Sequence, residues 1–177
     1  MTGRLFFVVG PSGAGKDTLL SGAVAADPRL YWVRRVITRP ESAGGEPFEG
    51  VTQAEFDTRQ ARGDFALHWQ AHGLHYGVPH TELGALAAGG CVLVNGSRGA
   101  LMQAQAAFPG LLVIHITAPL TVLAERLAAR GRESRAEVEA RLARSDLGLP
   151  DGVAAITISN DASPAEGVAR LLQALRA

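Results

Sequence analysis

The sequence shows no excess of charge of either sign and no pair of cysteines. Lys plus Arg and Asp plus Glu number 17 each, so the formal net charge is zero. A nucleic-acid-binding module usually carries a basic excess, and we therefore expect no nucleic-acid partner. The single cysteine, Cys91, lies in the apolar run CVLV and is expected to be a buried thiol rather than a nucleophile.

Membrane and export segments are also missing from the sequence. No stretch approaches the roughly 20 apolar residues that cross a membrane. The apolar run after Arg4 has about five residues, fewer than a signal peptide needs, and it leads directly into a glycine-rich turn. A chain of 177 residues fits one domain. We therefore expect a single cytoplasmic domain over residues 1–177 without a membrane partner.

Lysine is nearly absent. Of the 17 basic residues 16 are arginine, and Lys16 is the only lysine. Lysine is a compact point charge on a thin stem, whereas arginine is a broad planar fork. A lone lysine in such a chain indicates a position where a compact charge is required.

Short apolar runs alternate with helix-forming segments along most of the chain. Strands are expected at residues 5–9, 31–37, 91–94, 111–116 and 154–158. Helices are expected at residues 16–26, 52–62, 82–88, 99–107, 120–129, from about 135, and 164–175. This alternation predicts an α/β fold with a five-stranded parallel sheet covered by helices on both faces. Residues 41–50 are expected to be a loop, and the irregular stretch at about 38–80 is expected to be an insertion that binds the acceptor substrate.

The segment GPSGAGKDT predicts a phosphate-binding loop. It follows the pattern G-x-x-x-x-G-K at Gly10, Gly15 and Lys16, after an apolar strand and before a helix, a context that disfavours a simple turn. In such a loop the backbone N–H groups surround the β-phosphate of ATP, and lysine reaches the β- and γ-phosphates. The expected ATP-binding residues of this segment are Gly10, Pro11, Ser12, Gly13, Ala14, Gly15, Lys16, Asp17 and Thr18.

Asp17 departs from the pattern, which has Ser or Thr at this position. A carboxylate is also a hard oxygen ligand and could hold Mg²⁺ directly or through water. The alternative is an acidic residue that only stabilises the first turn of the helix. We expect Asp17 and Thr18 to be the Mg²⁺-binding residues, with Thr18 also able to contact the α-phosphate.

Clusters of arginine predict a polyanionic acceptor. Transfer to a phosphate needs no general base, because the acceptor is already an anion, but it needs Mg²⁺ and arginines to offset repulsion. The candidate arginines are Arg34, Arg35, Arg39, Arg98, Arg126, Arg130, Arg132, Arg135, Arg141 and Arg144. For Arg132, Arg135 and Arg144 a solvated helix face is the alternative.

Four histidines lie in one short segment, at His68, His72, His75 and His80. The spacing of His72 and His75 is compatible with metal ligands. The neighbouring aromatic residues and glycines favour the wall of a pocket instead.

Several motifs together resemble the ribose 1,5-bisphosphate phosphokinases, a branch of the guanylate-kinase-like P-loop kinases. They are GPSGAGKDT, VITR at Val36 to Arg39, Tyr76-Gly77, VNGSR at Val94 to Arg98, and RGRE at Arg130 to Glu133. The resemblance covers essentially the whole chain. It implies the ATP-dependent conversion of a small sugar phosphate, ribose 1,5-bisphosphate, to 5-phosphoribosyl 1-diphosphate in phosphonate metabolism.

The sequence departs from guanylate kinase itself where that enzyme binds guanine. In an alignment on Tyr76-Gly77, Leu67 occupies the position of the guanine-binding glutamate, and Val78 replaces a hydroxyl residue. Gly96 takes the place of an acidic residue near the end of the third strand. A site built to hydrogen-bond a base cannot lose these groups without a large penalty. The resemblance thus implies a retained grip on phosphate without recognition of a base.

The resemblance also implies roles for individual residues. Lys16, Arg126 and Arg130 would be catalytic, with a lid at about 130–145. Asn160 and Asp161 match the loop that passes the adenine. The implied substrate-binding residues are Arg35, Arg39, Tyr76, Asn95, Ser97, Arg98 and Arg141. For Asn95 and Ser97 a structural turn is the alternative.

Two other functions remain open from the sequence. A guanylate or other nucleoside monophosphate kinase would share the phosphate loop. A non-catalytic guanylate-kinase-like interaction module would share the fold, but such modules typically lose the loop lysine, and Lys16 argues against this class.

Overall fold

The computed structural model describes residues 3–129, 135–145 and 148–177. Its main sheet has five parallel strands in the order β2-β7-β1-β8-β9. Their bounds are β1 Arg4–Val9, β2 Leu30–Trp32, β7 Cys91–Asn95, β8 Leu112–Thr117 and β9 Ile156–Ser159. The prediction of an α/β fold around a five-stranded parallel sheet is confirmed.

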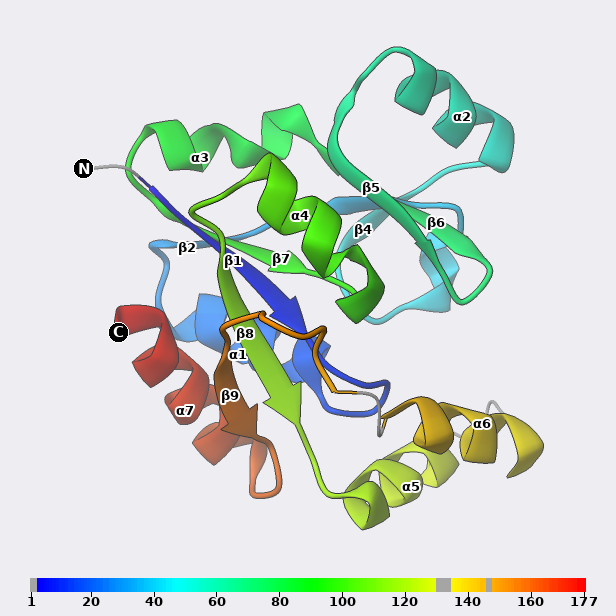
Figure 1. The fold of residues 1–177 in the computed structure, drawn as a ribbon, viewed down its shortest axis with the longest axis vertical. Helices are drawn as coiled ribbons and strands as arrows, with labels where there is room; N and C mark the ends of the chain where they lie inside the picture. Colours follow the sequence, from blue (N-terminus) through cyan, green and yellow to red (C-terminus); the bar gives the residue numbers. More distant parts are fainter. Residues whose placement is uncertain (1–2, 130–134, 146–147) are drawn as a thin grey trace.

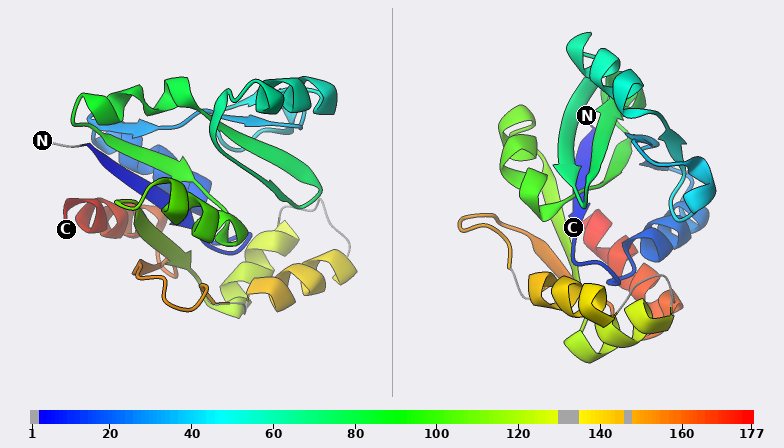
Figure 2. Two further views of the ribbon diagram at one scale, coloured as in Figure 1. Left: turned by 45° about the horizontal axis from the view of Figure 1, so that its top comes forward. Right: turned by 90° about the vertical axis from the view of Figure 1, so that its right-hand side faces the viewer.

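Helices cover both faces of this sheet (Figures 1 and 2). On one face lie α1 (Lys16–Ala26) and α7 (Pro164–Arg176), and on the other lie α3 (Gly84–Ala87) and α4 (Leu101–Ala107). The strand β1 explains why both faces need cover. Its side chains alternate between two hydrophobic cores, Phe6 and Val8 in the core with α1 and α7, and Phe7 and Val9 in the core with α4.

A second, smaller sheet is formed by residues between β2 and α3. Its order is β4-β3-β6-β5, with β3 and β4 parallel and the other pairs antiparallel. The strands are β3 Arg35–Ile37, β4 Phe48–Gly50, β5 Phe65–Ala71 and β6 Leu74–Pro79, and the helix α2 (Gln53–Ala61) packs on them. Phe56 of α2 stacks on Phe65 with a centroid distance of 4.8 Å.

Residues 31–37, expected to form one strand, form parts of two strands in different sheets. Leu30–Trp32 pairs with β7 of the main sheet, whereas Arg35–Ile37 pairs with β4 and β6 of the smaller sheet. The apolar pattern is similar in both pieces, so the sequence does not show where the chain leaves one sheet for the other. The smaller sheet therefore begins at Arg35, slightly before the insertion expected at about 38–80.

The strands β5 and β6 form a hairpin within the stretch that was expected to be irregular. Its turn consists of His72 and Gly73, which have φ angles of 53° and 73°. Positive φ at both central residues matches the right-handed twist of the strands. Glycine adopts this angle readily and histidine is one of the residues enriched there.

The remaining segments complete the molecule. Short 3₁₀ turns lie at Glu41–Ala43, His80–Leu83 and Arg98–Ala100, so the helices expected at residues 82–88 and 99–107 each begin with a 3₁₀ turn. The helices α5 (Leu120–Ala129) and α6 (Arg135–Ser145) lie side by side at the same end of the molecule as the tip of the β5–β6 hairpin (Figure 2). In the part of the chain that is described, none of the helices combines the length and apolar character that crossing a membrane requires.

Candidate active site

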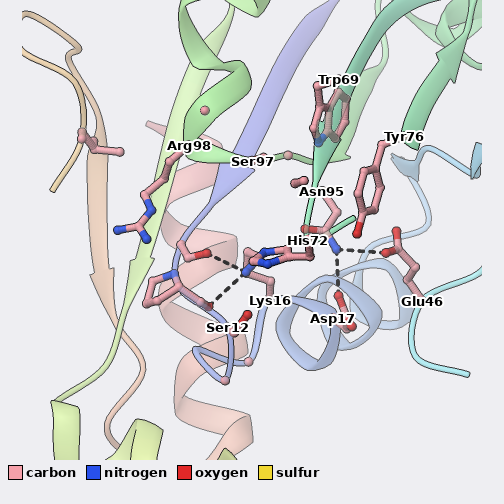
Figure 3. Close-up of a pocket in the computed structure, with 18 of the residues that line it drawn as sticks. Ser12, Lys16, Asp17, Glu46, Trp69, His72, Tyr76, Asn95, Ser97 and Arg98 are labelled. Carbon is pink, nitrogen blue, oxygen red and sulfur yellow. Dashed lines mark hydrogen bonds between the residues drawn. The ribbon is translucent and has the colours of Figure 1, made fainter. Parts of the chain in front are cut away.

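A pocket of about 800 Å³ lies at the carboxyl ends of β1 and β7, between the phosphate loop and the smaller sheet (Figure 3). In a parallel sheet this is the edge at which ligands bind. The described residues that line it are Gly10, Pro11, Ser12, Gly13, Gly15, Lys16, Asp17, Thr18, Arg35, Glu46, Trp69, Ala71, His72, Tyr76, Asn95, Gly96, Ser97, Arg98, Gly99, Gly148, Leu149, Pro150 and Asp151.

The phosphate loop joins β1 to α1, as the motif predicts. Gly15, the residue before the helix, has a φ angle of 89°, and a Cβ there would lie 2.5 Å from the amide nitrogen of Asn160. At Gly10 a Cβ would collide with the carbonyl oxygen of Ile116 in β8. Both glycines are therefore required by the conformation of the loop and by the close approach of its neighbours.

Lys16 is folded back onto the loop. Its Nζ donates hydrogen bonds to the carbonyl oxygens of Gly10 at 2.8 Å and Pro11 at 3.1 Å. The pKa of Lys16 is lowered to about 8, mainly by burial and to a smaller extent by the nearby Arg35 and Arg98, while Asp17 and Glu46 oppose the shift. The single lysine of the chain thus lies at the centre of the pocket (Figure 3).

Arg126 and Asn160 contact the outer side of the phosphate loop. Arg126 Nη1 donates to the carbonyl oxygens of Gly13 at 3.3 Å and Ala14 at 3.4 Å, and its Nη2 donates to the carbonyl oxygen of Asn160 at 3.0 Å. The side-chain amide of Asn160 donates to the carbonyl oxygen of Ala14 at 2.7 Å. Neither Arg126 nor Asn160 is among the described residues that line the pocket.

Asp17 and Asn95 connect the phosphate loop to the smaller sheet. Asn95 Nδ2 donates to Asp17 Oδ1 at 2.8 Å and lies 3.5 Å from Glu46 Oε1 (Figure 3). Glu46 in turn binds Arg35 of β3, whose Nε donates to Glu46 Oε2 at 2.9 Å and whose Nη2 donates to Oε1. Arg35, Glu46 and Asn95 are all buried. Burial of such charges is tolerated because they are paired and hydrogen-bonded.

The smaller sheet supplies an aromatic wall to the pocket. The rings of Trp69 and Tyr76 stack in parallel with a centroid distance of 5.6 Å. The guanidinium of Arg35 lies 4.8 Å from the ring centroid of Tyr76 and 5.7 Å from that of Trp69. At these distances the rings attract the guanidinium electrostatically. His72 lines the same pocket from the hairpin turn.

The other predicted acceptor residues are divided between the pocket and its surroundings. Ser97 and Arg98 line the pocket, and burial lowers the pKa of the Arg98 guanidinium below its usual value. Arg39 is not among the described lining residues; its guanidinium lies 4.3 Å from the ring centroid of Phe48, and Nη2 donates to the carbonyl oxygen of Gly44 at 3.1 Å.

Three further predicted residues have different placements. Arg130 lies outside the described residues. Arg141 lies on α6, and its side chain is not described. Asp161 is near the surface, where it pairs with Arg170 at 2.9 Å, a contact that lowers the pKa of the Asp161 carboxyl.

The positions that would recognise guanine are part of the core. Leu67 and Val78 are opposite each other on β5 and β6, with 4% and 0% of their surface exposed. A Cβ at Gly96 would collide with the ring of Phe7. A polar side chain at any of these three positions would disturb packing, and the pocket offers no base-binding group from them.

A metal ion would have oxygen donors beside the phosphate loop. Asp17 and Thr18 both line the pocket there, and a carboxylate with a hydroxyl suits Mg²⁺. Within residues 3–129, 135–145 and 148–177, no group of three or more His, Cys, Asp or Glu side chains is arranged to hold a metal. The described histidines at positions 68, 72, 75 and 80 belong to no such group.

Glu46 and Trp69 are among the pocket residues that have no counterpart in the site residues predicted from sequence. Glu46 lies in a stretch expected to be an irregular loop, and nothing in the local sequence shows that it is buried. Trp69, His72 and Tyr76 line the pocket, as expected of a pocket wall in this aromatic segment.

The fold and the phosphate loop define a P-loop kinase in which a second sheet faces the loop. Guanylate kinase from Anaplasma phagocytophilum has the same fold, with a TM-score of 0.70 and 20% identity over 99% of this chain and 85% of that one. No protein-family model matches the chain. Ribose 1,5-bisphosphate phosphokinase PhnN from Pseudomonas fluorescens is 49% identical over 182 aligned residues, which cover 97% of this chain and 94% of that protein. The chain belongs to the ribose 1,5-bisphosphate phosphokinase family, as its motifs predict.

A longer relative contains the same unit. The bifunctional ribose 1,5-bisphosphokinase-thymidine phosphorylase from Cupriavidus necator is 50% identical over 176 residues. The match covers 99% of this chain but 29% of that protein.

Proposed function

We propose that this chain transfers the γ-phosphoryl group of ATP to the 1-phosphate of ribose 1,5-bisphosphate, forming 5-phosphoribosyl 1-diphosphate and ADP. The observation that carries the proposal is the combination of an intact phosphate loop with an acceptor pocket that lacks base-recognition groups. Leu67 and Val78 are buried in the core, whereas Arg35 and Tyr76 line the pocket. A sugar bisphosphate has phosphates to bind and no base. The product would serve phosphonate utilisation in the cytoplasm.

The phosphate loop would hold the triphosphate through its N–H groups, since its carbonyls at Gly13 and Ala14 are held by Arg126 and Asn160. Lys16 would exchange its bonds to two loop carbonyls for the β- and γ-phosphates, and there its charge offsets the charge that develops in transfer. Asp17 and Thr18 would hold Mg²⁺, and the bound ion would reduce the repulsion between the two anionic substrates.

The acceptor would bind on the opposite side of the pocket. Arg35 uses two of its five N–H donors on Glu46, which leaves three for a phosphate. Tyr76, Ser97 and Arg98 would complete the grip, and Arg39 would join it by leaving the carbonyl oxygen of Gly44. Arg126, Arg130 and Arg141 remain predicted lid residues that would close over ATP.

The test is turnover by the purified protein with ATP, Mg²⁺ and either ribose 1,5-bisphosphate or GMP as acceptor. We expect ADP to form with the sugar and only at background rate with GMP. The Lys16→Ala variant should lose turnover while keeping the thermal unfolding midpoint of the wild type. Turnover of GMP alone would identify a nucleoside monophosphate kinase. ATP binding without turnover of either acceptor would identify a non-catalytic module.

A further inference from the structure

Glu46 is a buried carboxylate in the wall of the pocket. It precedes β4 in the segment that joins β3 to β4, and 6% of its side chain is exposed. Glutamate is rarely buried unless it is paired. The partner is Arg35, which is equally buried, so the pair is neutral overall. Neutrality alone does not explain why a carboxylate faces a pocket for anions.

The carboxylate of Glu46 retains the capacity to accept another hydrogen bond. An ionised carboxylate offers about four acceptor positions. In the described structure Oε1 accepts hydrogen bonds from Arg35 Nη2 and, at 3.5 Å, from Asn95 Nδ2. Oε2 accepts only one there, from Arg35 Nε at 2.9 Å. One acceptor position is therefore left on Oε2, in a residue that lines the pocket.

The surrounding charges determine what kind of group can use this position. Asn95 links Glu46 to a second carboxylate, Asp17. A phosphate oxygen placed against Glu46 would meet negative charge, whereas a neutral hydroxyl could donate to it at no electrostatic cost. Figure 3 shows the cationic group of Arg98 on the opposite side of the view from Glu46, with Lys16 between them. The pocket thus separates a region suited to phosphates from one suited to a hydrogen-bond donor.

We propose that Glu46 accepts a hydrogen bond from a ring hydroxyl of the acceptor's ribose and so selects hydroxylated sugar bisphosphates over their deoxy analogues. The inference rests on the proposed function, because it concerns the same acceptor site. Arg35 is then shared between the sugar and its phosphate: it orients Glu46 through two hydrogen bonds and has donors left for the phosphate. Loss of a hydrogen bond to a buried charged group leaves that group unsatisfied, so the penalty for a missing hydroxyl is large.

The experiment compares kcat/KM for ribose 1,5-bisphosphate with that for its 2-deoxy and 3-deoxy analogues. Wild-type protein should prefer the parent sugar over at least one analogue by about 10- to 100-fold. In Glu46→Gln the preference should fall to about threefold or less, because kcat/KM drops for the parent sugar and changes less for that analogue. The KM for ATP should stay within about twofold of wild type, a result that general damage to the fold would not give.

Glu49→Gln is the matched control, since Glu49 lies three positions along, pairs with Arg59 and is not among the described lining residues. It should keep the wild-type preference. If Glu46→Gln does not fold, Glu46→Asp provides the second test, and its shorter side chain should weaken the same preference. Equal use of all three sugars by the wild type, or an unchanged preference in the Glu46 variant, overturns the inference. Absence of turnover with every sugar contradicts the proposed function instead.

Discussion

The side-chain amide of Asn160 donates a 2.7 Å hydrogen bond to the carbonyl oxygen of Ala14, although 146 positions separate the two residues. Asn160 follows the last strand of the main sheet, and Ala14 lies in the phosphate loop. Because the carbonyl is engaged from outside the pocket, this contact fixes the position of the Ala14 peptide in the loop. We propose that Asn160 acts on a bound nucleotide through the shape of the loop, whose backbone N–H groups would contact the phosphates.

Asn160→Asp should weaken ATP binding. The aspartate would place a carboxylate oxygen against the carbonyl oxygen of Ala14, so an attractive contact becomes a repulsive one in a buried site. We expect the KM for ATP to rise about tenfold and the free energy of unfolding to fall by about 1–3 kcal/mol. Steady-state kinetics and urea denaturation measure the two effects.

The control for this variant is Gln103→Glu, the same chemical change at an exposed position of α4. It should leave both quantities at wild-type values. If Asn160→Asp binds ATP as tightly as the wild type, the proposed support of the loop by Asn160 is wrong.

ATP binding should weaken as pH rises through about 8. Burial lowers the pKa of Lys16 from 10.5 to about 8 in the free protein, and only the protonated lysine attracts phosphate. In the complex the phosphates favour the charged form, so the pKa rises again. We expect kcat/KM for ATP to fall above pH 8 while kcat stays constant to higher pH. A KM for ATP that is constant between pH 7 and 9.5 would contradict this.

The same lysine should make stability increase with pH. The pKa in the folded state is about 8 and lies below the unfolded value, so the unfolded chain binds more protons between pH 8 and about 10.5. The penalty of burying a charged lysine is complete below pH 8 and disappears as pH rises through that window. Lys16→Met should remove this contribution. Urea denaturation at several pH values would then show a smaller difference in the free energy of unfolding between pH 8 and pH 10 than in the wild type.

Asp17→Ser should increase the Mg²⁺ requirement. The substitution removes one negative charge beside the phosphate loop and the acceptor of the Asn95 hydrogen bond. We expect the Mg²⁺ concentration for half-maximal activity to rise about tenfold, equivalent to 1.4 kcal/mol. The matched control is Asp57→Ser, at an exposed position of α2. An unchanged Mg²⁺ requirement would show that the carboxylate of Asp17 is not needed to bind the metal.

Leu67→Glu should destabilise the protein without creating guanylate kinase activity. Leu67 is 4% exposed and lies opposite Val78 in the hydrophobic core, where a glutamate would place a charge among apolar side chains. We expect the free energy of unfolding to fall by about 3 kcal/mol.

The control is Leu67→Met, which conserves volume and should lower the free energy of unfolding by about 1.5 kcal/mol or less. A stable Leu67→Glu variant with GMP turnover would refute the assignment of this position to the core.

Local sequence patterns predict most of the elements of the fold. The strand–loop–helix unit around Lys16 follows from an apolar run, a glycine pattern and a helix-forming segment, which act over a few residues. The helix at residues 120–129 has the expected bounds, and α7 ends one residue later than expected. The exchange of sheets between Trp32 and Arg35 could not be predicted, because both pieces have strand-forming sequences and only their partners differ.

The candidate site divides in the same way. By itself the sequence determined the phosphate loop, its unusual Asp17 and the absence of guanine-binding groups, since each depends on residue identity within a short motif. Only the tertiary structure brought Glu46 to Arg35 and Asn95, and Asn160 to Ala14. These contacts join distant parts of the chain through the order of strands in two sheets. Because a buried charge or amide without a hydrogen-bond partner is costly, burial favours these contacts wherever the fold brings such groups together.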